Sequence, residues 1–494
     1  MSHISSNVVV NILPQKRLQT VFLLFFIIVN AALILFAVDK EIETSDGRKY
    51  SLNATYAHAS DGQRYWGTAI SLAKTGQFLM RDDETIHHAD NSLPPLSRSG
   101  PVPAILFAVP IRLLGFENAV VGIIAGQCFL LFVMSLAARG IAQPFQANKN
   151  LVQGLVLFNP NLIGHAHHAQ SDLIFAFIFT LLLLIMSKLI DKPSSFRLST
   201  AIAIGVLAGL LPLTRPMGVY CILFLPIFVL IALWFRQRFV RINWLHLLKL
   251  TFISATLTLT ILMPWATRNY VVFGDFGLVQ SGAIQSRYYY RTLRAYGMPE
   301  STKAVEMYLL ERGYDPSCID SGEPGSGCEK AVRNAYMNLI LSAPKTILAK
   351  AGTAAIAKTL LSGGTSTITK YLGLHPTEGN YNIQEQLNWE SLKEFLAKMH
   401  QQIPPYLLLF LLITAFPLAT RGLGLIGIIR AISTPASHGH LIFHTLMIIL
   451  LITMYGLQGW SRFRVPMEPI LMIFAAIALS KLESPAKKLA IKKN

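Results

Sequence analysis

The chain has 494 residues, of which 52% are hydrophobic and only 14% are charged, and its formal net charge is +17. A soluble globular protein usually carries about 25% charged residues, so this composition excludes an ordinary soluble enzyme. Several charge-poor runs approach the roughly 20 apolar residues with which a helix crosses a bilayer. The sequence therefore predicts a mainly α, polytopic transmembrane helix bundle, and we expect no nucleic-acid partner.

The apolar runs predict about ten membrane-spanning helices, with about twelve as the upper bound. They lie near residues 18–38, 117–138, 150–163, 171–189, 199–213, 217–235, 246–266, 403–420, 440–458 and 466–481. The first run lacks a small-residue cleavage site, so we expect a retained span rather than a removed signal peptide. Lys and Arg gather in the segments that this arrangement leaves inside. This positive-inside pattern predicts that both termini are cytoplasmic.

Three parts follow from this topology. Residues 1–266 form an N-terminal transmembrane catalytic module, which includes a first extracytoplasmic loop at 39–116. Residues 267–402 form an extracytoplasmic domain, and residues 403–494 hold the last spans and a basic cytoplasmic tail. The proline-bracketed run 101–115 is short, and counting it as a span would reverse the charge rule downstream. We therefore expect it to be an interfacial helix.

A carboxylate opens the stretch "DGQRYWGTAISLAKTGQF" in the first loop. Asp61 precedes a helix of amphipathic spacing, Arg64 follows on the next turn, and Trp66 and Ile70 are expected to dip into the acyl boundary of the membrane. Charges at a membrane usually have a task or a partner. Asp61 is therefore a candidate general base, with a helix N-cap as the plain alternative.

A second acid stands at the mouth of a span, in "HAHHAQSDLIFAF". Asp172 is a candidate catalytic residue, and helix capping is again the alternative. His165, His167 and His168 precede it, and imidazole and carboxylate groups together suit a divalent metal ion. The spacing matches no fixed metal signature, so solvated loop histidines are the alternative.

Five arginines lie at predicted outer span ends or in the first loop, where the charge rule expects few. They are Arg98 in "PPLSRSGPVP", Arg215 in "LPLTRPMG", Arg268 in "PWATRNYVVFGDF", and Arg462 and Arg464 in "GWSRFRVPMEP". The planar guanidinium grips phosphate in a bidentate manner. Snorkelling towards lipid headgroups is the alternative. With Arg64, these residues predict a binding site for a lipid phosphate at the outer membrane face.

The large outer segment contains "CIDSGEPGSGC" and "SRYYYRTLRAY". Cys318 and Cys328 flank a polar turn outside the cytoplasm, where oxidation is favoured, so we expect a disulfide; two free thiols are the alternative. The stretch 286–296 has the aromatic and basic residues that suit sugar stacking and anion contacts, although a solvated helical face has a similar composition. Cys128 and Cys221 lie in apolar runs and are expected in the core.

Several motifs, in order, resemble those of the GT-C membrane glycosyltransferases, specifically the bacterial relatives of protein mannosyltransferases and aminoarabinose transferases. They are "DGQRYWGTAISLAKTGQF", "PPLSRSGPVPAILFAVPIRLLG", "QSDLIFAFIFTLLLL", "GLLPLTRPMG", "PWATRNYVVFGDFGLVQSGA" and "RFRVPMEPILMIFAAIAL". The resemblance implies an inverting transfer of a sugar from a polyprenyl-phosphate donor at the periplasmic face of a bacterial inner membrane. It also implies an acceptor that is a glycolipid, a polysaccharide or a protein.

The resemblance implies roles for individual residues of this chain. Asp61 matches the first-loop catalytic acid, Asp172 the second acid, and Arg215 the basic residue of the turn. The chain departs from the pattern at Gly62, where many relatives have Glu, and at Leu93, where Lys is frequent. Arg98 is the candidate to replace that lysine. A divalent metal ion is an open alternative as a cofactor.

Two other function classes collect charges near spans. An oligosaccharide polymerase or ligase is the nearer alternative. A flippase or transporter is expected to show inverted repeats and helices broken near the midplane, whereas the charges here gather at one face beside a large outer domain. A scaffold protein fits least well.

Overall fold

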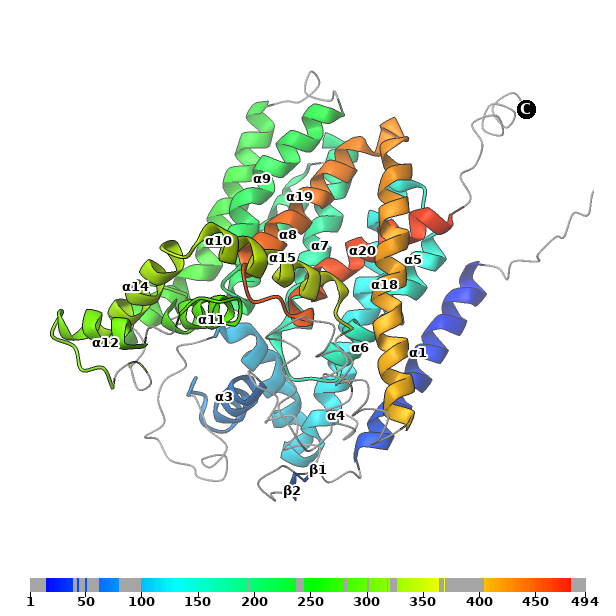
Figure 1. Cartoon of the computed structure of the whole chain (residues 1–494). Helices are drawn as coiled ribbons and strands as arrows, with labels where there is room; N and C mark the ends of the chain where they lie inside the picture. The colour runs from blue at the N-terminus through cyan, green and yellow to red at the C-terminus, as the bar shows by residue number, and fades with distance from the viewer. Residues whose placement is uncertain are drawn as a thin grey trace, which may run out of the picture.

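The computed structural model describes most of the chain (Figure 1). It covers residues 15–38, 42–43, 49–50, 62–79, 99–193, 196–236, 244–274, 276–278, 282–299, 302–317, 319, 327–363, 368 and 404–480. Within these residues nearly all regular structure is helical. The strands described are β1 (Ile42–Glu43) and β2 (Lys49–Tyr50), which pair antiparallel with Ile42 opposite Tyr50.

The helices follow one another along the whole described chain. The α-helices are α1 (Gln15–Val38), α3 (Gly62–Thr75), α4 (Pro101–Ile141), α5 (Lys149–Leu157), α6 (Pro160–Ala166), α7 (Ser171–Asp191), α8 (Leu198–Thr214), α9 (Gly218–Phe235), α10 (Trp244–Phe273), α11 (Gly282–Ala295), α12 (Thr302–Leu310), α14 (Gly327–Leu341), α15 (Lys345–Leu361), α18 (Pro404–Ile432), α19 (His438–Tyr455) and α20 (Glu468–Leu479). The 3-10 helices are η2 (Gln143–Phe145), η5 (Pro435–Ser437) and η6 (Ser461–Met467).

Seven helices in the described ranges are long and apolar enough to cross a membrane: α1, α4, α7, α9, α10, α18 and α19. Helix α8 is a shorter apolar helix, and α14 and α15 together form an apolar pair that bends by 103°. These helices confirm the predicted polytopic transmembrane bundle. The chain is an integral, multi-pass membrane protein.

The predicted interfacial run 101–115 is not a separate element, because it continues into the next span as α4. The two parts meet at a kink at Gly115, whose φ of 76° and ψ of 165° are not helical. Glycine adopts this positive φ without the Cβ clash that other residues suffer. Pro101 occupies the first helical turn, where its missing N–H costs no hydrogen bond.

Two of the predicted spans are assembled from short helices. The run 150–163 divides into α5 and α6, because Asn159 caps α6 by accepting hydrogen bonds from the backbone N–H groups of Asn161 and Leu162. The run 466–481 begins in η6 and continues as the 12-residue α20. Helix α20 packs on α5, and η6 packs on α6. Such interruptions are tolerated at membrane depth when protein buries them.

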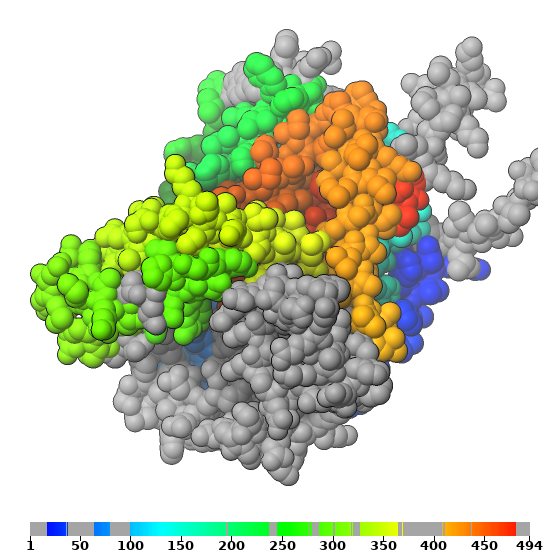
Figure 2. Space-filling view, in the orientation of Figure 1, coloured from blue at the N-terminus to red at the C-terminus, as the bar shows by residue number. Residues whose placement is uncertain are grey.

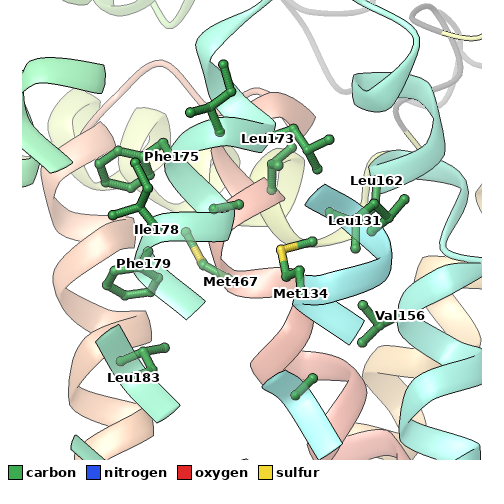
Figure 3. Packing of buried hydrophobic residues seen from close by; sticks show 14 of the residues in the cluster. Leu131, Met134, Val156, Leu162, Leu173, Phe175, Ile178, Phe179, Leu183 and Met467 are labelled. Carbon is green, nitrogen blue, oxygen red and sulfur yellow. The ribbon is translucent and has the colours of Figure 1, made fainter. Parts of the chain in front are cut away.

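The main core lies between α4, α5, α6, α7 and η6 (Figure 3). Labelled side chains of this core are Leu131, Met134, Val156, Leu162, Leu173, Phe175, Ile178, Phe179, Leu183 and Met467. In other helix pairs a small residue at the interface lets the two backbones approach closely, as is common in membrane proteins. A Cβ at Gly427 of α18 would lie 1.8 Å from the carbonyl oxygen of Phe474 in α20.

Three helices, α7, α9 and α19, meet at one end of the bundle through polar contacts. Asp191, at the end of α7, pairs with Arg236 after α9. The Nε2 atom of His440 in α19 lies 3.0 Å from Oδ1 of Asp191. The functional candidates lie at the opposite end of α7.

A smaller unit of α11, α12 and α14 projects from the side of the bundle (Figures 1 and 2). Its own buried cluster consists of Tyr290, Val305, Leu309, Ala331, Val332, Ala335 and Tyr336. Helix α15 leads from this unit back to η6 and α18, which it contacts. The unit lies within the predicted outer segment 267–402.

Candidate active site

Three elements bring charged residues together at the start of α7. Asp172 is in the first turn of α7 and is completely buried. Arg215 follows the last residue of α8, and its Nη1 donates to Oδ1 of Asp172. Arg462 lies on η6, and its Nη2 donates to Oδ2 of Asp172 at 3.1 Å. The turn after α8 and helix η6 reach Asp172 because both α8 and η6 pack on α7.

Counted over the described residues alone, the cluster of Asp172, Arg215 and Arg462 has one positive charge in excess. Arginine keeps its charge in proteins, and its planar fork suits carboxylate and phosphate equally. The arginine side chains are only 13% and 12% exposed. Electrostatic attraction is stronger where water is scarce. The cluster therefore has the charge and the donors for an anion, and Asp172 holds the two guanidinium groups in place.

An aromatic stack adjoins the cluster. The ring of Tyr455 lies parallel to that of Phe463, with 4.0 Å between centroids, and Trp460 stacks on Phe463 at 5.6 Å. The guanidinium of Arg215 lies 6.0 Å from the centroid of Tyr455, within the range of a cation–π contact. The buried hydroxyl of Tyr455 has no hydrogen-bond partner within the described part of the chain. Tyr455 could not be predicted from the sequence, because an aromatic residue near the end of an apolar helix gives no distinct signal.

Helix α3 reaches the cluster from the first loop. The Tyr65 hydroxyl donates to Oγ of Ser171, the neighbour of Asp172, at 2.9 Å. Trp66 and Ile70 are buried in protein, where α3 packs on α4. The expectation that these two side chains dip into lipid is therefore wrong. The apolar face of α3 is bound by α4 instead.

Of three further predicted site residues, the structure describes only one. Asp61 and Arg98 lie outside the described residues, so their roles stay predictions. Arg64 lies on α3 and is half-buried. Helix α3 begins at Gly62, directly after Asp61, and its Tyr65 bonds Ser171, the neighbour of Asp172.

The three histidines before α7 do not gather on one point. His167 places Nε2 2.8 Å from Oδ1 of Asn30, and Gln127 donates Nε2 to the carbonyl oxygen of His168 at 2.9 Å. Among the described residues no three His, Cys, Asp or Glu side chains are arranged to hold a metal ion. Asn30 and Gln127 tie the histidine segment to α1 and α4. The metal site stays a prediction.

Of the three histidines, His165 interacts electrostatically with the residues of the Asp172 cluster. It is buried, and neither ring nitrogen has a hydrogen-bond partner within the described ranges. Burial lowers the pKa of His165 to about 3, while Asp172 opposes the shift and Arg462 adds to it. The imidazole is therefore neutral at physiological pH. Burial also lowers the pKa of His167 to about 3.

Arg464 does not face Asp172, although it is two residues from Arg462. It pairs with Glu468 and donates Nη1 to the carbonyl oxygens of Thr359 and Leu360 at 2.8 and 3.1 Å. Arg421 of α18 donates Nη2 to the same Glu468 at 2.9 Å. This second ion cluster binds η6, α15, α18 and α20 together. This structural role of Arg464 differs from the phosphate contact that the sequence predicts.

Arg268 is likewise separate from the Asp172 cluster in its contacts. It lies on α10, with its guanidinium 4.8 Å from the ring centroid of Trp265 and 5.1 Å from that of Phe273. Its Nη1 donates to Oδ1 of Asn269 at 2.8 Å. These contacts place Arg268 where α10 meets the segment after α3, since Nη2 also lies 3.5 Å from the carbonyl oxygen of Phe78.

The cysteines divide as the sequence suggests, as far as the structure describes them. Cys128 and Cys221 are free and buried. Cys328 is the second residue of α14, whereas Cys318 lies outside the described residues. The Cys318–Cys328 disulfide therefore stays a prediction.

Comparison with known proteins finds similarity in structure alone. No family model matches the sequence, and no curated protein matches it. The archaeal oligosaccharyltransferase AglB from Archaeoglobus fulgidus, in complex with an inhibitory peptide and a dolichol-phosphate, matches with a TM-score of 0.50 and 13% identity. The match covers 97% of this chain and 51% of AglB, so the chain spans about half the length of that protein.

ArnT from Cupriavidus metallidurans bound to undecaprenyl phosphate also matches, with a TM-score of 0.38 and 13% identity over 91% of this chain and 78% of ArnT. The likeness to AglB extends over nearly the whole of this chain, and it agrees with the order of motifs in the sequence. The chain has the fold of the GT-C glycosyltransferases.

Proposed function

We propose that the chain is an inverting glycosyltransferase that moves a sugar from a polyprenyl-phosphate donor to an acceptor at the periplasmic face of a bacterial inner membrane. One observation carries the proposal. Arg215 and Arg462, from segments far apart in the sequence, converge on the buried Asp172 at the ends of membrane helices. The similar AglB structure holds a dolichol-phosphate, which is a lipid phosphate of the proposed kind.

The reaction breaks the bond between the anomeric carbon and the phosphate oxygen, and it forms a bond from that carbon to an acceptor oxygen. Negative charge develops on the departing phosphate. Arg215 and Arg462 are positioned to stabilise this charge, since fixed donors aimed at a developing anion lower the barrier. Asp172 acts as a positioning residue that keeps both guanidinium groups in one orientation.

The acceptor hydroxyl must lose a proton as it attacks. We assign this role to Asp61, as a general base. Support comes from its place in the sequence, directly before α3, and from the bond between Tyr65 of α3 and Ser171 beside Asp172. The attack comes from the face of the sugar opposite the phosphate, which gives inversion at the anomeric carbon.

A second candidate is the transfer or polymerisation of a preassembled oligosaccharide. It is favoured by the fold likeness to AglB, which is an oligosaccharyltransferase. The two candidates differ in the donor, since one takes a polyprenyl-phosphate monosaccharide and the other a lipid-linked oligosaccharide. A flippase, the third class, moves its lipid without cleaving the sugar.

The test uses the purified full-length protein in lipid nanodiscs with a labelled undecaprenyl-phosphate monosaccharide and an extract of bacterial envelope glycolipids, polysaccharides and proteins as the acceptor. Release of undecaprenyl phosphate, with loss of this release in Arg215→Ala and Arg462→Ala, supports the proposal. Arg430→Ala is the matched control. Arg430 lies on α18, donates to the carbonyl oxygen of Ala478 near the end of α20, and has no contact with Asp172. The same assay with EDTA tests a divalent-metal requirement. Cleavage of a lipid-linked oligosaccharide alone favours the second candidate, and an intact donor in every case contradicts both.

A further inference from the structure

A pocket outside the Asp172 cluster lies between α11, α15 and the connection from α19 to η6. Its volume is about 230 Å³. Residues of its lining that carry polar or aromatic groups include Tyr288, Arg291, Tyr296, Lys358, Gln458 and Trp460. Pockets for drug-sized ligands measure about 300–1,000 Å³, so this pocket suits a smaller group, of the size of one sugar residue.

The walls of the pocket are held in a fixed arrangement. Gly459 has a φ of 57°, and a Cβ there would lie 2.5 Å from the Cα of Ala355 in α15. Gly456 has a φ of 55°, and a Cβ there would lie 3.1 Å from the hydroxyl of Tyr289 in α11. Glycine therefore lets the connection lie directly against both helices.

The lining combines aromatic rings with positive charge. Tyr288 and Trp460 meet edge to face with centroids 6.1 Å apart, and aromatic rings of this kind pack against the apolar face of a sugar. Arg291 supplies a cationic group, and no acidic residue is among the described lining. The Tyr296 hydroxyl is a buried polar atom with no hydrogen-bond partner in the described chain. Such a lining suits a sugar that carries a negative charge.

The pocket is connected to the Asp172 cluster through η6. Trp460 lines the pocket and stacks on Phe463, which stacks on Tyr455 beneath Arg215. Arg462, two residues after Trp460, reaches Asp172. The pocket and the residues proposed to hold the donor phosphate are therefore linked by one aromatic stack.

We propose that this pocket binds an acidic saccharide, a sugar bearing a carboxylate or a phosphate, as part of the acceptor. The role as acceptor site rests on the proposed glycosyl transfer. The binding itself does not, because the pocket's chemistry is independent of the reaction.

The experiment measures binding to the purified full-length protein in detergent, without donor, by isothermal titration. The probes are methyl glucuronide, glucose 6-phosphate and uncharged methyl glucoside. We expect both anionic sugars to bind more tightly than the glucoside, and Arg291→Ala to weaken their binding about tenfold, as loss of a charge-assisted hydrogen bond does. Arg294→Ala is the matched control, since Arg294 is an exposed residue of the same helix that does not line the pocket. Comparison of the two anionic probes shows whether the pocket binds a carboxylate or a phosphate more tightly.

Three results overturn the proposal: equal binding of charged and uncharged probes, equal effects of Arg291→Ala and Arg294→Ala, or no saturable binding. Failure of the proposed function is distinguishable from these. If the protein binds acidic sugars through Arg291 but never cleaves a polyprenyl-phosphate sugar, the transferase assignment fails and the pocket stands. If it cleaves the donor but ignores acidic sugars, the pocket assignment alone fails.

Discussion

Replacing Asp172 by Asn keeps the volume of the side chain but removes its charge. Two guanidinium groups, both nearly buried, then lose the carboxylate to which both donate. Removing one partner of a buried ion pair costs about 3–5 kcal/mol, and this range applies here because Asp172 is completely buried. We therefore expect Asp172→Asn to unfold at a clearly lower temperature than the native protein.

The same variant should respond more strongly to a lipid phosphate. An anion that binds the folded state stabilises it by mass action, and in Asp172→Asn the phosphate replaces the missing carboxylate. Thermal unfolding in detergent, with and without undecaprenyl phosphate, measures both effects. We expect a larger ligand-induced rise in Asp172→Asn than in the native protein.

Asp191→Asn is the matched control. Asp191 also pairs with an arginine, Arg236, but at the opposite end of α7, and its side chain is 37% exposed. We expect a smaller loss of stability and a ligand response equal to that of the native protein. If undecaprenyl phosphate raises the unfolding temperature of both variants equally, the reasoning that places the phosphate at Asp172 is refuted.

Three further substitutions have defined outcomes. Arg215→Lys keeps the charge but loses the planar fork, and we expect donor cleavage to fall at least about tenfold, whereas full activity would show that charge alone suffices. Tyr65→Phe removes one neutral hydrogen bond, to Ser171, and should cost about 0.5–1.5 kcal/mol of stability in a denaturation assay; no change would mean that α3 is held without it. His165→Phe should matter most at low pH. Because burial lowers the folded-state pKa of His165 to about 3, the unfolded chain binds the proton first as the pH falls below about 6.5, and stability is lost towards pH 3. The variant should lose less stability over this interval, and parallel pH profiles would contradict the prediction.

The charge pattern led from sequence to the cluster, because Asp172, Arg215 and Arg462 all stand at span ends where insertion costs and the charge rule disfavour them. The same pattern could not separate Arg462 from Arg464. Both arginines lie on η6, and residues two apart on a 3-10 helix, which has three residues per turn, face different directions. Arg464 therefore meets Glu468 while Arg462 meets Asp172.

The transmembrane bundle was predictable from apolar run length, whereas the breaks within it were not. Hydropathy does not register the Asn159 cap that divides α5 from α6, nor the η6 turn that precedes α20. Tyr455 was missed for a related reason, since only the packing of α19 on η6 shows that it lies beneath Arg215. Tertiary contacts between distant segments determined each of these features.

A structure of the full chain with bound undecaprenyl phosphate provides the decisive measurement. The account predicts phosphate oxygens at hydrogen-bond distance, about 2.7–3.0 Å, from the guanidinium groups of both Arg215 and Arg462. A phosphate bound at another site, with no contact to Arg215 or Arg462, would contradict it.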